Sequence, residues 1–179
     1  MPTFVALLRG INVGKAKRVP MAELRSLLEE LGYDDVRTLL NSGNAVFAHT
    51  SRSATRHATD IARALESHFH FEVPVIVKST ADLRTIARQN SLAGPGVDPS
   101  KLLVIFPRAA RPPASLARLA TTVALPDRIA VGERAAYLHC PAGILTSPTA
   151  KRALDGLGET ITTRNWSTVE KLLAWATDG

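Results

Sequence analysis

The chain has 179 residues, of which 45% are apolar and 21% charged, a globular composition that excludes a disordered chain. This length can bury a sizeable core in one domain or in two small units, so the fold needs no disulfide or metal staple. The single cysteine, Cys140, excludes an internal disulfide framework and a multi-cysteine zinc site. The net charge of +6 favours anionic partners.

The basic residues are unevenly distributed, because residues 1–22 and 99–126 contain lysine and arginine but no acid. No apolar run approaches the roughly 18 residues that span a membrane. Residues 1–8 form an apolar stretch without a basic leader, so we expect no signal peptide. These features together predict a cytoplasmic protein with no membrane partner.

The first half of the chain predicts strands and helices in the order β-α-β-β-α-β, which is the split βαβ unit of ferredoxin-like folds. Pro20 opens the first helix, and Gly32 ends it. Ser42-Gly43 predicts a two-residue hairpin turn between the middle strands. The predicted segments, in chain order, are residues 3–9, 20–31, 36–40, 44–48, 53–68 and 73–77.

The second half repeats this order after a connecting helix over residues 80–89. The predicted segments are residues 101–106, 113–121, 129–131, 135–140, 147–154 and 159–163, followed by a final helix over 167–177. We therefore predict an α+β fold of two tandem ferredoxin-like (βαββαβ) repeats. The first repeat covers residues 1–79, and residues 80–100 form a connecting helix and loop. Residues 101–179 form the second repeat with the C-terminal helix, and we expect the whole chain to make one compact unit.

This topology brings separate loops together, because the first two strands of a split βαβ unit run in the same direction. In the first half, residues 10–19, 41–44 and 68–72 are expected at one end of the sheet. In the second half, the equivalent end holds residues 107–112, 132–133 and 155–158. The polar, basic end of the sheet is the predicted working surface.

Four runs of residues carry a resemblance to a known family, namely residues 6–14 (ALLRGINVG), 19–21 (VPM), 42–44 (SGN) and 163–166 (TRNW) with Thr168. They resemble the bacterial family catalogued as domain of unknown function 1697, over essentially the whole chain. Lys15 stands where members often carry a second glycine. The resemblance implies a small cytoplasmic α+β protein with no established activity, cofactor or catalytic residues.

Residues 10–15 (GINVGK) invite comparison with a nucleotide-binding P-loop but are one residue too short, and Ala16 replaces the magnesium-binding hydroxyl. Two interpretations stay open. The glycines let backbone N–H groups form an anion nest beside Arg9 and Lys15, or they only permit positive φ in a tight loop.

Ser42 and Asn44 are explained by the hairpin turn, and they also suit hydrogen bonds to a ligand beside Arg9. A nucleophilic Ser42 would need a base, and no carboxylate is placed to orient His68 or His70. No catalytic constellation is recognisable, and we expect no metal site and no cofactor.

The segment 162–168 lies where the last strand becomes the last helix. Ser167 with Glu170 predicts a capping box, and Asn165 is an alternative cap. Capping does not require Arg164. Arg164 is therefore either a ligand-binding residue or one partner of a partly buried ion pair.

We predict a polyanion- or nucleic-acid-binding module that uses basic loops, with phosphate contacts outweighing base stacking because only 5% of residues are aromatic. One alternative is a binder of, or enzyme acting on, a small anionic, phosphorylated metabolite, and another is a protein-interaction scaffold. The predicted ligand-binding residues are Arg9, Asn12, Lys15, Ser42, Asn44, Arg164 and Asn165.

Overall fold

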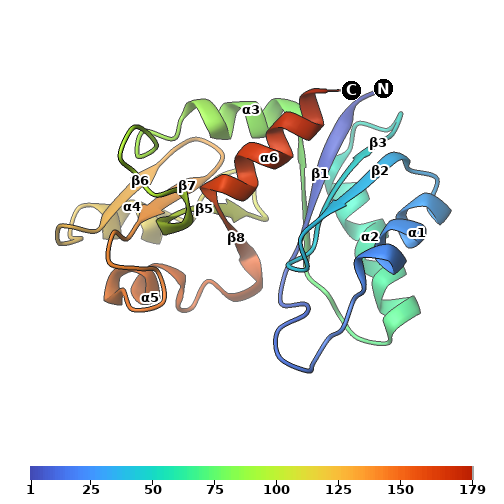
Figure 1. The fold of residues 1–179 in the computed structure, drawn as a ribbon, viewed down its shortest axis with the longest axis horizontal. Helices are drawn as coiled ribbons and strands as arrows, with labels where there is room; N and C mark the ends of the chain where they lie inside the picture. The colour runs from blue at the N-terminus through green and yellow to red at the C-terminus, as the bar shows by residue number, and fades with distance from the viewer. Residues whose placement is uncertain (179) are drawn as a thin grey trace. The chain divides into compact units, whose positions relative to one another are not determined.

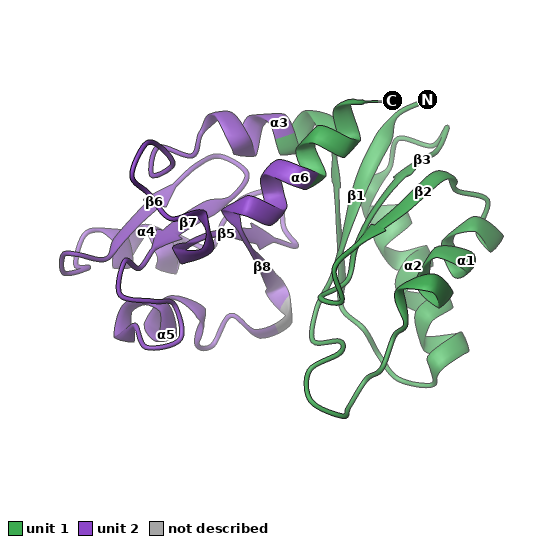
Figure 2. Ribbon diagram, viewed as in Figure 1, with its two compact units in different colours: residues 1–83, 172–179 green, residues 84–171 purple. Residues whose placement is uncertain are grey.

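The computed structural model describes residues 1–178, apart from the side chain of Glu159. These residues form two compact units (Figure 2), the first from residues 1–83 and the segment that starts at Leu172, the second from residues 84–171. The helices α3 (Thr80–Arg88) and α6 (Trp166–Thr177) contribute to both units. The division drawn from the sequence differs here, because it placed all of residues 101–179 in the second half.

The first unit contains a four-stranded antiparallel sheet with strand order β2-β3-β1-β4 (Figure 1). The predicted element order is confirmed, and each element end differs from its prediction by at most two residues. The elements are β1 (Thr3–Leu8), α1 (Met21–Glu30), β2 (Asp34–Leu39), β3 (Asn44–Ala48), α2 (Ala54–Phe69) and β4 (Val75–Ser79).

The second unit contains another four-stranded antiparallel sheet, with the equivalent order β6-β7-β5-β8. The elements are β5 (Leu102–Pro107), α4 (Ala114–Ala120), β6 (Arg128–Val131), β7 (Ala136–His139), α5 (Pro148–Leu154) and β8 (Ile161–Asn165), with short 3₁₀ turns at Pro99–Lys101 and Gly158–Thr160. The strand predicted over 159–163 thus begins two residues later, and the side chain of Glu159 lies outside the described part. Residues 1–178 form an α+β fold with two four-stranded sheets and six α-helices.

The core of the first unit forms between one face of its sheet and the helices α1 and α2. Side chains alternate along a strand, so Phe4 and Leu8 of β1 point to the same face. They pack with Leu24 of α1 and with Ile61 and Leu65 of α2, all of which are buried. Each such side chain contributes roughly 1.5–3 kcal/mol when it leaves water.

The second unit buries both faces of its sheet. On one face, Ile105 and Leu138 pack with Leu116 of α4 and Ala153 of α5. On the other face, the hydroxyl of the fully buried Tyr137 donates a hydrogen bond to the carbonyl of Ile86 in α3, at 2.6 Å. This bond satisfies the one polar atom that the tyrosine ring takes into the core.

The C-terminal part of α6, which belongs to the first unit, is bonded by Thr80, whose hydroxyl donates to the carbonyl of Ala176 at 3.4 Å, and by Arg37. The Nη2 group of Arg37 in β2 donates to the carbonyl of Trp175 at 2.5 Å, and its guanidinium lies 5.2 Å from the centroid of the Trp175 ring. Val36, the preceding residue, belongs to the core with α1 and α2. Arg37 therefore holds the C-terminal part of α6, from Leu172 on, against the opposite face of the sheet.

The β2–β3 connection has four residues, 40–43, because the strand pairing ends at Leu39 and Asn44. The prediction of a two-residue turn at Ser42-Gly43 was wrong. Leu40 adopts a φ of 60° and Gly43 a φ of 88°, and the N–H of Gly43 donates to the carbonyl of Leu40 at 3.2 Å. The β6–β7 connection is also longer than predicted, since the pairing ends at Val131 and Ala136.

We expect Gly43→Ala to lower the free energy of unfolding by about 2–4 kcal/mol. A Cβ atom at Gly43 would lie 2.7 Å from Cδ1 of Ile11 and 2.8 Å from Cβ of Leu8, in addition to the strain of the positive φ. Gly14→Ala is the matched control, because Gly14 also has a positive φ but faces open space. Urea denaturation of both variants measures the difference, and equal losses would contradict the close packing around Gly43.

Candidate functional site

Three loops meet at one end of the first sheet, as the topology predicted. The N–H of Leu8 donates to the carbonyl of Gly43 at 2.8 Å, which joins the end of β1 to the β2–β3 connection. The N–H of Arg9 donates to the carbonyl of Pro74 at 3.0 Å, which joins it to the segment before β4. The long connection between β1 and α1 projects from this end (Figure 1). We call its residues 10–19 the basic loop.

Asn12 closes the basic loop with its side-chain amide. The Oδ1 atom accepts the N–H of Val19 at 2.9 Å, and Nδ2 donates to the carbonyls of Val19 at 2.9 Å and Asn41 at 2.7 Å. The backbone N–H of Asn12 also donates to the carbonyl of Lys17 at 3.1 Å. Its φ of 55° is left-handed, a conformation that asparagine tolerates. These contacts give Asn12 a structural role, because both N–H groups and the oxygen of the amide are already bonded.

The cations of the basic loop differ in their surroundings. Lys15 and Arg18 are exposed, whereas Arg9, which directly precedes the loop, is half-buried where β1 ends. The Nζ group of Lys17 donates to the backbone carbonyl of Glu72 at 2.9 Å, which ties the loop to the segment before β4. The loop therefore presents positive charge on a backbone that is held at several points.

Ser42 lies in the β2–β3 connection, and Asn44 is the first residue of β3. Asn44 is fully buried, and its Nδ2 group donates to the carbonyl of Leu39 at 2.8 Å and to Oγ of Ser42 at 3.1 Å. Asn44 thus stabilises the four-residue turn, and Ser42 remains exposed above it. The expectation that no carboxylate orients His68 was wrong, because its Nε2 atom lies 3.2 Å from the carboxylate of Glu23, with which it forms an exposed pair.

Arg164 of β8 is almost completely buried, with 8% of its surface exposed. Its Nη1 group donates to the hydroxyl of Thr162 at 3.0 Å and to the carbonyl of Thr163 at 2.7 Å. Burial lowers the pKa of the guanidinium to about 10, so it remains a cation at neutral pH.

Asn165, beside it, is the last residue of β8 and caps α6. Its Oδ1 atom accepts the N–H of Thr168 at 3.4 Å and the hydroxyl of the same residue at 2.7 Å. Of the two predicted caps, Asn165 is the one observed, because α6 begins at Trp166 and Ser167 already lies in its first turn.

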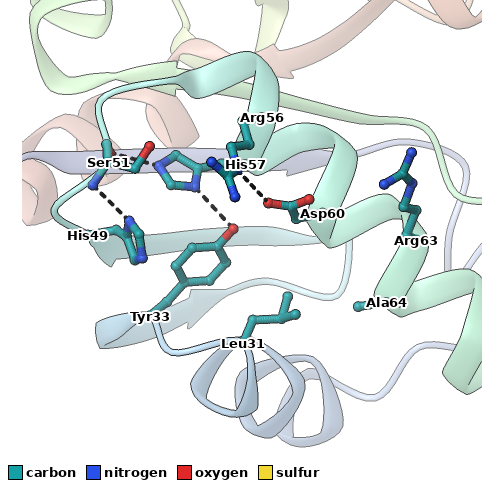
Figure 3. Close-up of a pocket in the computed structure, with 9 residues that line it drawn as sticks. All are labelled: Leu31, Tyr33, His49, Ser51, Arg56, His57, Asp60, Arg63 and Ala64. Carbon is teal, nitrogen blue, oxygen red and sulfur yellow. Dashed lines mark hydrogen bonds and ion pairs between the residues drawn. The ribbon is translucent and has the colours of Figure 1, made fainter.

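A buried histidine was missed by the sequence analysis. His57 of α2 is 2% exposed, and its Nε2 lies 3.0 Å from the carbonyl of Ser51, which can only accept (Figure 3). In the neutral ring that nitrogen therefore carries the proton, and Nδ1 accepts the hydroxyl of Tyr33 at 3.1 Å. Burial raises the pKa of Tyr33 to about 12, so its hydroxyl remains a donor. The spacing along the sequence could have indicated that His57 is buried, because it precedes Ile61 and Leu65 by one and two helical turns.

Within the described residues 1–178, no three His, Cys, Asp or Glu side chains are grouped as metal ligands. None of the described helices is both long and apolar enough to cross a membrane.

Cys140 is buried and its Sγ donates to the hydroxyl of Ser147 at 3.3 Å. Burial raises the pKa of this thiol, which keeps it protonated.

The family model of proteins of unknown function, DUF1697, matches residues 1–137, and the chain belongs to this family. The match includes the runs at 6–14, 19–21 and 42–44 and ends before the run at 163–168. The fold is similar to that of the conserved bacterial protein SP0830 from Streptococcus pneumoniae, with a TM-score of 0.73 and 22% identity over 98% of this chain and 99% of that one. No curated protein matches the chain.

We expect Asn12→Gly to lower the free energy of unfolding by about 2–3 kcal/mol, because glycine keeps the positive φ but removes three side-chain hydrogen bonds. Lys15→Ala removes an exposed side chain of the same loop and should change it by less than about 0.5 kcal/mol. Urea denaturation gives both values. A loss for Asn12→Gly no larger than that for Lys15→Ala would show that Asn12 does not hold the loop.

We expect Arg164→Ala to destabilise the fold by about 2–4 kcal/mol, by emptying the space of a large buried side chain. Arg152→Ala, on the exposed surface of α5, should have little effect. Folding lowers the pKa of Arg164, so burial of this cation destabilises the folded state. The destabilisation has its full size below about pH 10 and becomes smaller as the pH rises above that value. The loss should therefore be equal at about pH 6 and 9, and a loss that changed between them would contradict a permanently charged Arg164.

Proposed function

We propose that the protein binds polyanions, with nucleic acid as the foremost class, through the basic loop of the first unit. The observation that carries this proposal is the bracing of the loop by Asn12, which keeps exposed Lys15 and Arg18 on a fixed backbone. A fixed loop loses little conformational freedom on binding, so more of the attraction between charges becomes affinity.

The mode of binding follows from the residue types. Lysine and arginine attract phosphate groups whatever the base sequence, and residues 1–22 contain no acid to oppose them. Aromatic residues are scarce, and Phe4 and Phe47 are buried in the core of the first unit, so base stacking contributes little. We therefore expect binding that is weakly specific for sequence and strongly dependent on salt.

We infer that each unit is a ferredoxin-like repeat and that the protein acts in the cytoplasm. The shared element order and the equivalent strand orders β2-β3-β1-β4 and β6-β7-β5-β8 support the first inference. In such a unit, the loops after the first and second strands lie at the same end of the sheet, which is where the proposed binding surface lies.

A second candidate ligand for the same loop is a small phosphorylated metabolite. The positive φ angles of 70° at Gly10 and 60° at Gly14 support it, because a backbone anion nest requires residues in the left-handed region. Arg9, half-buried at the start of the loop, would then supply a charged hydrogen bond to the phosphate.

We expect Lys15→Ala/Arg18→Ala to weaken binding of fluorescently labelled single-stranded RNA and double-stranded DNA about tenfold or more at roughly 50 mM salt. The slope of the logarithm of the association constant against the logarithm of the salt concentration should become less negative by about 2, since two phosphate contacts are lost. Fluorescence anisotropy at roughly 50 and 200 mM salt measures both effects.

The matched control is Lys151→Ala/Arg152→Ala, which removes the same charge from exposed positions of α5 in the second unit. This variant should retain most of the affinity. Equal weakening by the two variants would contradict a localised site, and binding that is unchanged between the two salt concentrations would contradict phosphate recognition. If no nucleic acid binds at low salt but inorganic pyrophosphate binds the wild type more tightly than the loop variant, the metabolite is the ligand.

A further inference from the structure

A cavity of about 480 Å³ lies in the first unit, at the end of the sheet opposite the basic loop. The pairing of Ala48 with Thr3 and with Asp34 marks this end, whereas the basic loop joins the sheet beside Gly43. The volume falls in the range of sites that hold small molecules. No residue predicted from the sequence to bind a ligand lines it.

The cavity is lined by three kinds of surface (Figure 3). Leu31 at the end of α1 and Ala64 of α2 provide an aliphatic side, and Tyr33 and His49 provide aromatic rings whose centroids lie 5.3 Å apart. Charged side chains come from α2. Apolar walls with a few charged groups are typical of sites that bind an organic molecule rather than a bare ion.

The aromatic side is held in place by buried hydrogen bonds. Tyr33 donates to His57, and His57 donates to the carbonyl of Ser51. The ring of His57 also lies 4.8 Å from that of Phe4 and 5.5 Å from that of Phe47, centroid to centroid, in edge contacts. A ligand in the cavity would therefore meet a preformed surface, which lowers the entropy lost on binding.

His49 presents a hydrogen-bond donor in the neutral state. Its Nδ1 atom accepts the N–H of Ser51 at 2.9 Å, so the proton of the neutral ring is on Nε2. The direction of this hydrogen bond is set by Ser51, because a backbone N–H can only donate. His49 thus adds a donor to the lining of the cavity.

The charged residues of the lining carry an excess of positive charge. Arg56 is paired with Asp60, at 3.6 Å between Nε and Oδ2, and both side chains are substantially exposed. Arg63 also lines the cavity, one helical turn after Asp60, and makes no ion pair with any other residue of the described chain. Because Arg56 balances the negative charge of Asp60, the guanidinium of Arg63 is the group available to a ligand.

We propose that this cavity binds a small planar carboxylate, with its apolar body against Tyr33, Leu31 and Ala64 and its carboxylate on Arg63. The planar fork of a guanidinium matches the two oxygens of a carboxylate, and a flat ring fits beside the tyrosine and histidine rings. The site is separate from the basic loop, so it does not depend on the function proposed for that loop.

Sodium benzoate is the probe, titrated into the ¹⁵N-labelled chain of residues 1–179 and followed by amide chemical shifts. We expect shifts at residues around Tyr33, His49 and Arg63, with a dissociation constant on the order of 1 mM. Benzyl alcohol, which keeps the ring but has no charge, should bind at least about fivefold more weakly. Lys15→Ala/Arg18→Ala should bind benzoate as the wild type does.

Three variants test the role of charge. Arg63→Gln should weaken benzoate binding about tenfold, through the loss of a charge-assisted pair. Asp60→Asn should strengthen it about threefold, because a repelling carboxylate is lost and Arg56 is released. Arg52→Gln, which makes the same charge change at an exposed position outside the lining, should bind within about twofold of wild type.

Absence of benzoate-dependent shifts would overturn the proposal. So would equal binding of benzoate and benzyl alcohol, equal effects of Arg63→Gln and Arg52→Gln, or weaker binding by Asp60→Asn. Amide spectra of the variants without ligand show whether each remains folded, and Asp60→Asn, whose expected effect is a gain, cannot be explained by loss of folding.

Discussion

The side-chain amide of Asn12 is the constraint on which the proposed binding surface depends. Three hydrogen bonds from one amide close the basic loop and attach it to the carbonyl of Asn41 in the β2–β3 connection. Lys17 adds a second attachment, to the segment before β4. Without these bonds, a stretch of lysines, arginine and glycines would be a mobile chain whose charges repel one another. The hydrogen bonds of Asn12 hold the loop closed against the repulsion between its cations, and the amide itself adds no charge. The positive potential is therefore fixed in one place.

The sheet of the first unit separates two chemically different ends. At one end, β1 and the β2–β3 connection support a projecting, cationic loop that we propose binds a polyanion. At the other, the start of β2 and the end of β3 meet α2 around a cavity with aromatic and aliphatic walls. Phe4, Phe47 and His57 are buried beside that cavity, in ring contact with one another. The same buried side chains thus stabilise the unit and shape its cavity.

Much of the fold could be predicted from sequence, because alternation along the strands and helical spacing along α1 and α2 reflect burial directly. The meeting of the loops followed from element order alone. The four-residue β2–β3 connection could not be predicted, because it places Leu40 at a φ of 60°, which a leucine rarely adopts. The burial of Arg164 was only one of two open alternatives, since neither the partners of an arginine nor its exposure has a signature in spacing. Tyr33 and His57 lie 24 residues apart, and their hydrogen bond exists only once α2 has packed on the sheet.

The most direct test is the affinity of Asn12→Gly for labelled single-stranded RNA at roughly 50 mM salt, measured by fluorescence anisotropy on protein shown to be folded by circular dichroism. This variant retains every charge of the wild type and loses only the brace of the loop. If the fixed arrangement of Lys15 and Arg18 produces binding, the dissociation constant should rise about five- to tenfold, because the loop must be ordered when the ligand binds. An affinity equal to that of the wild type would contradict the account, since it would mean that net charge alone attracts the polyanion.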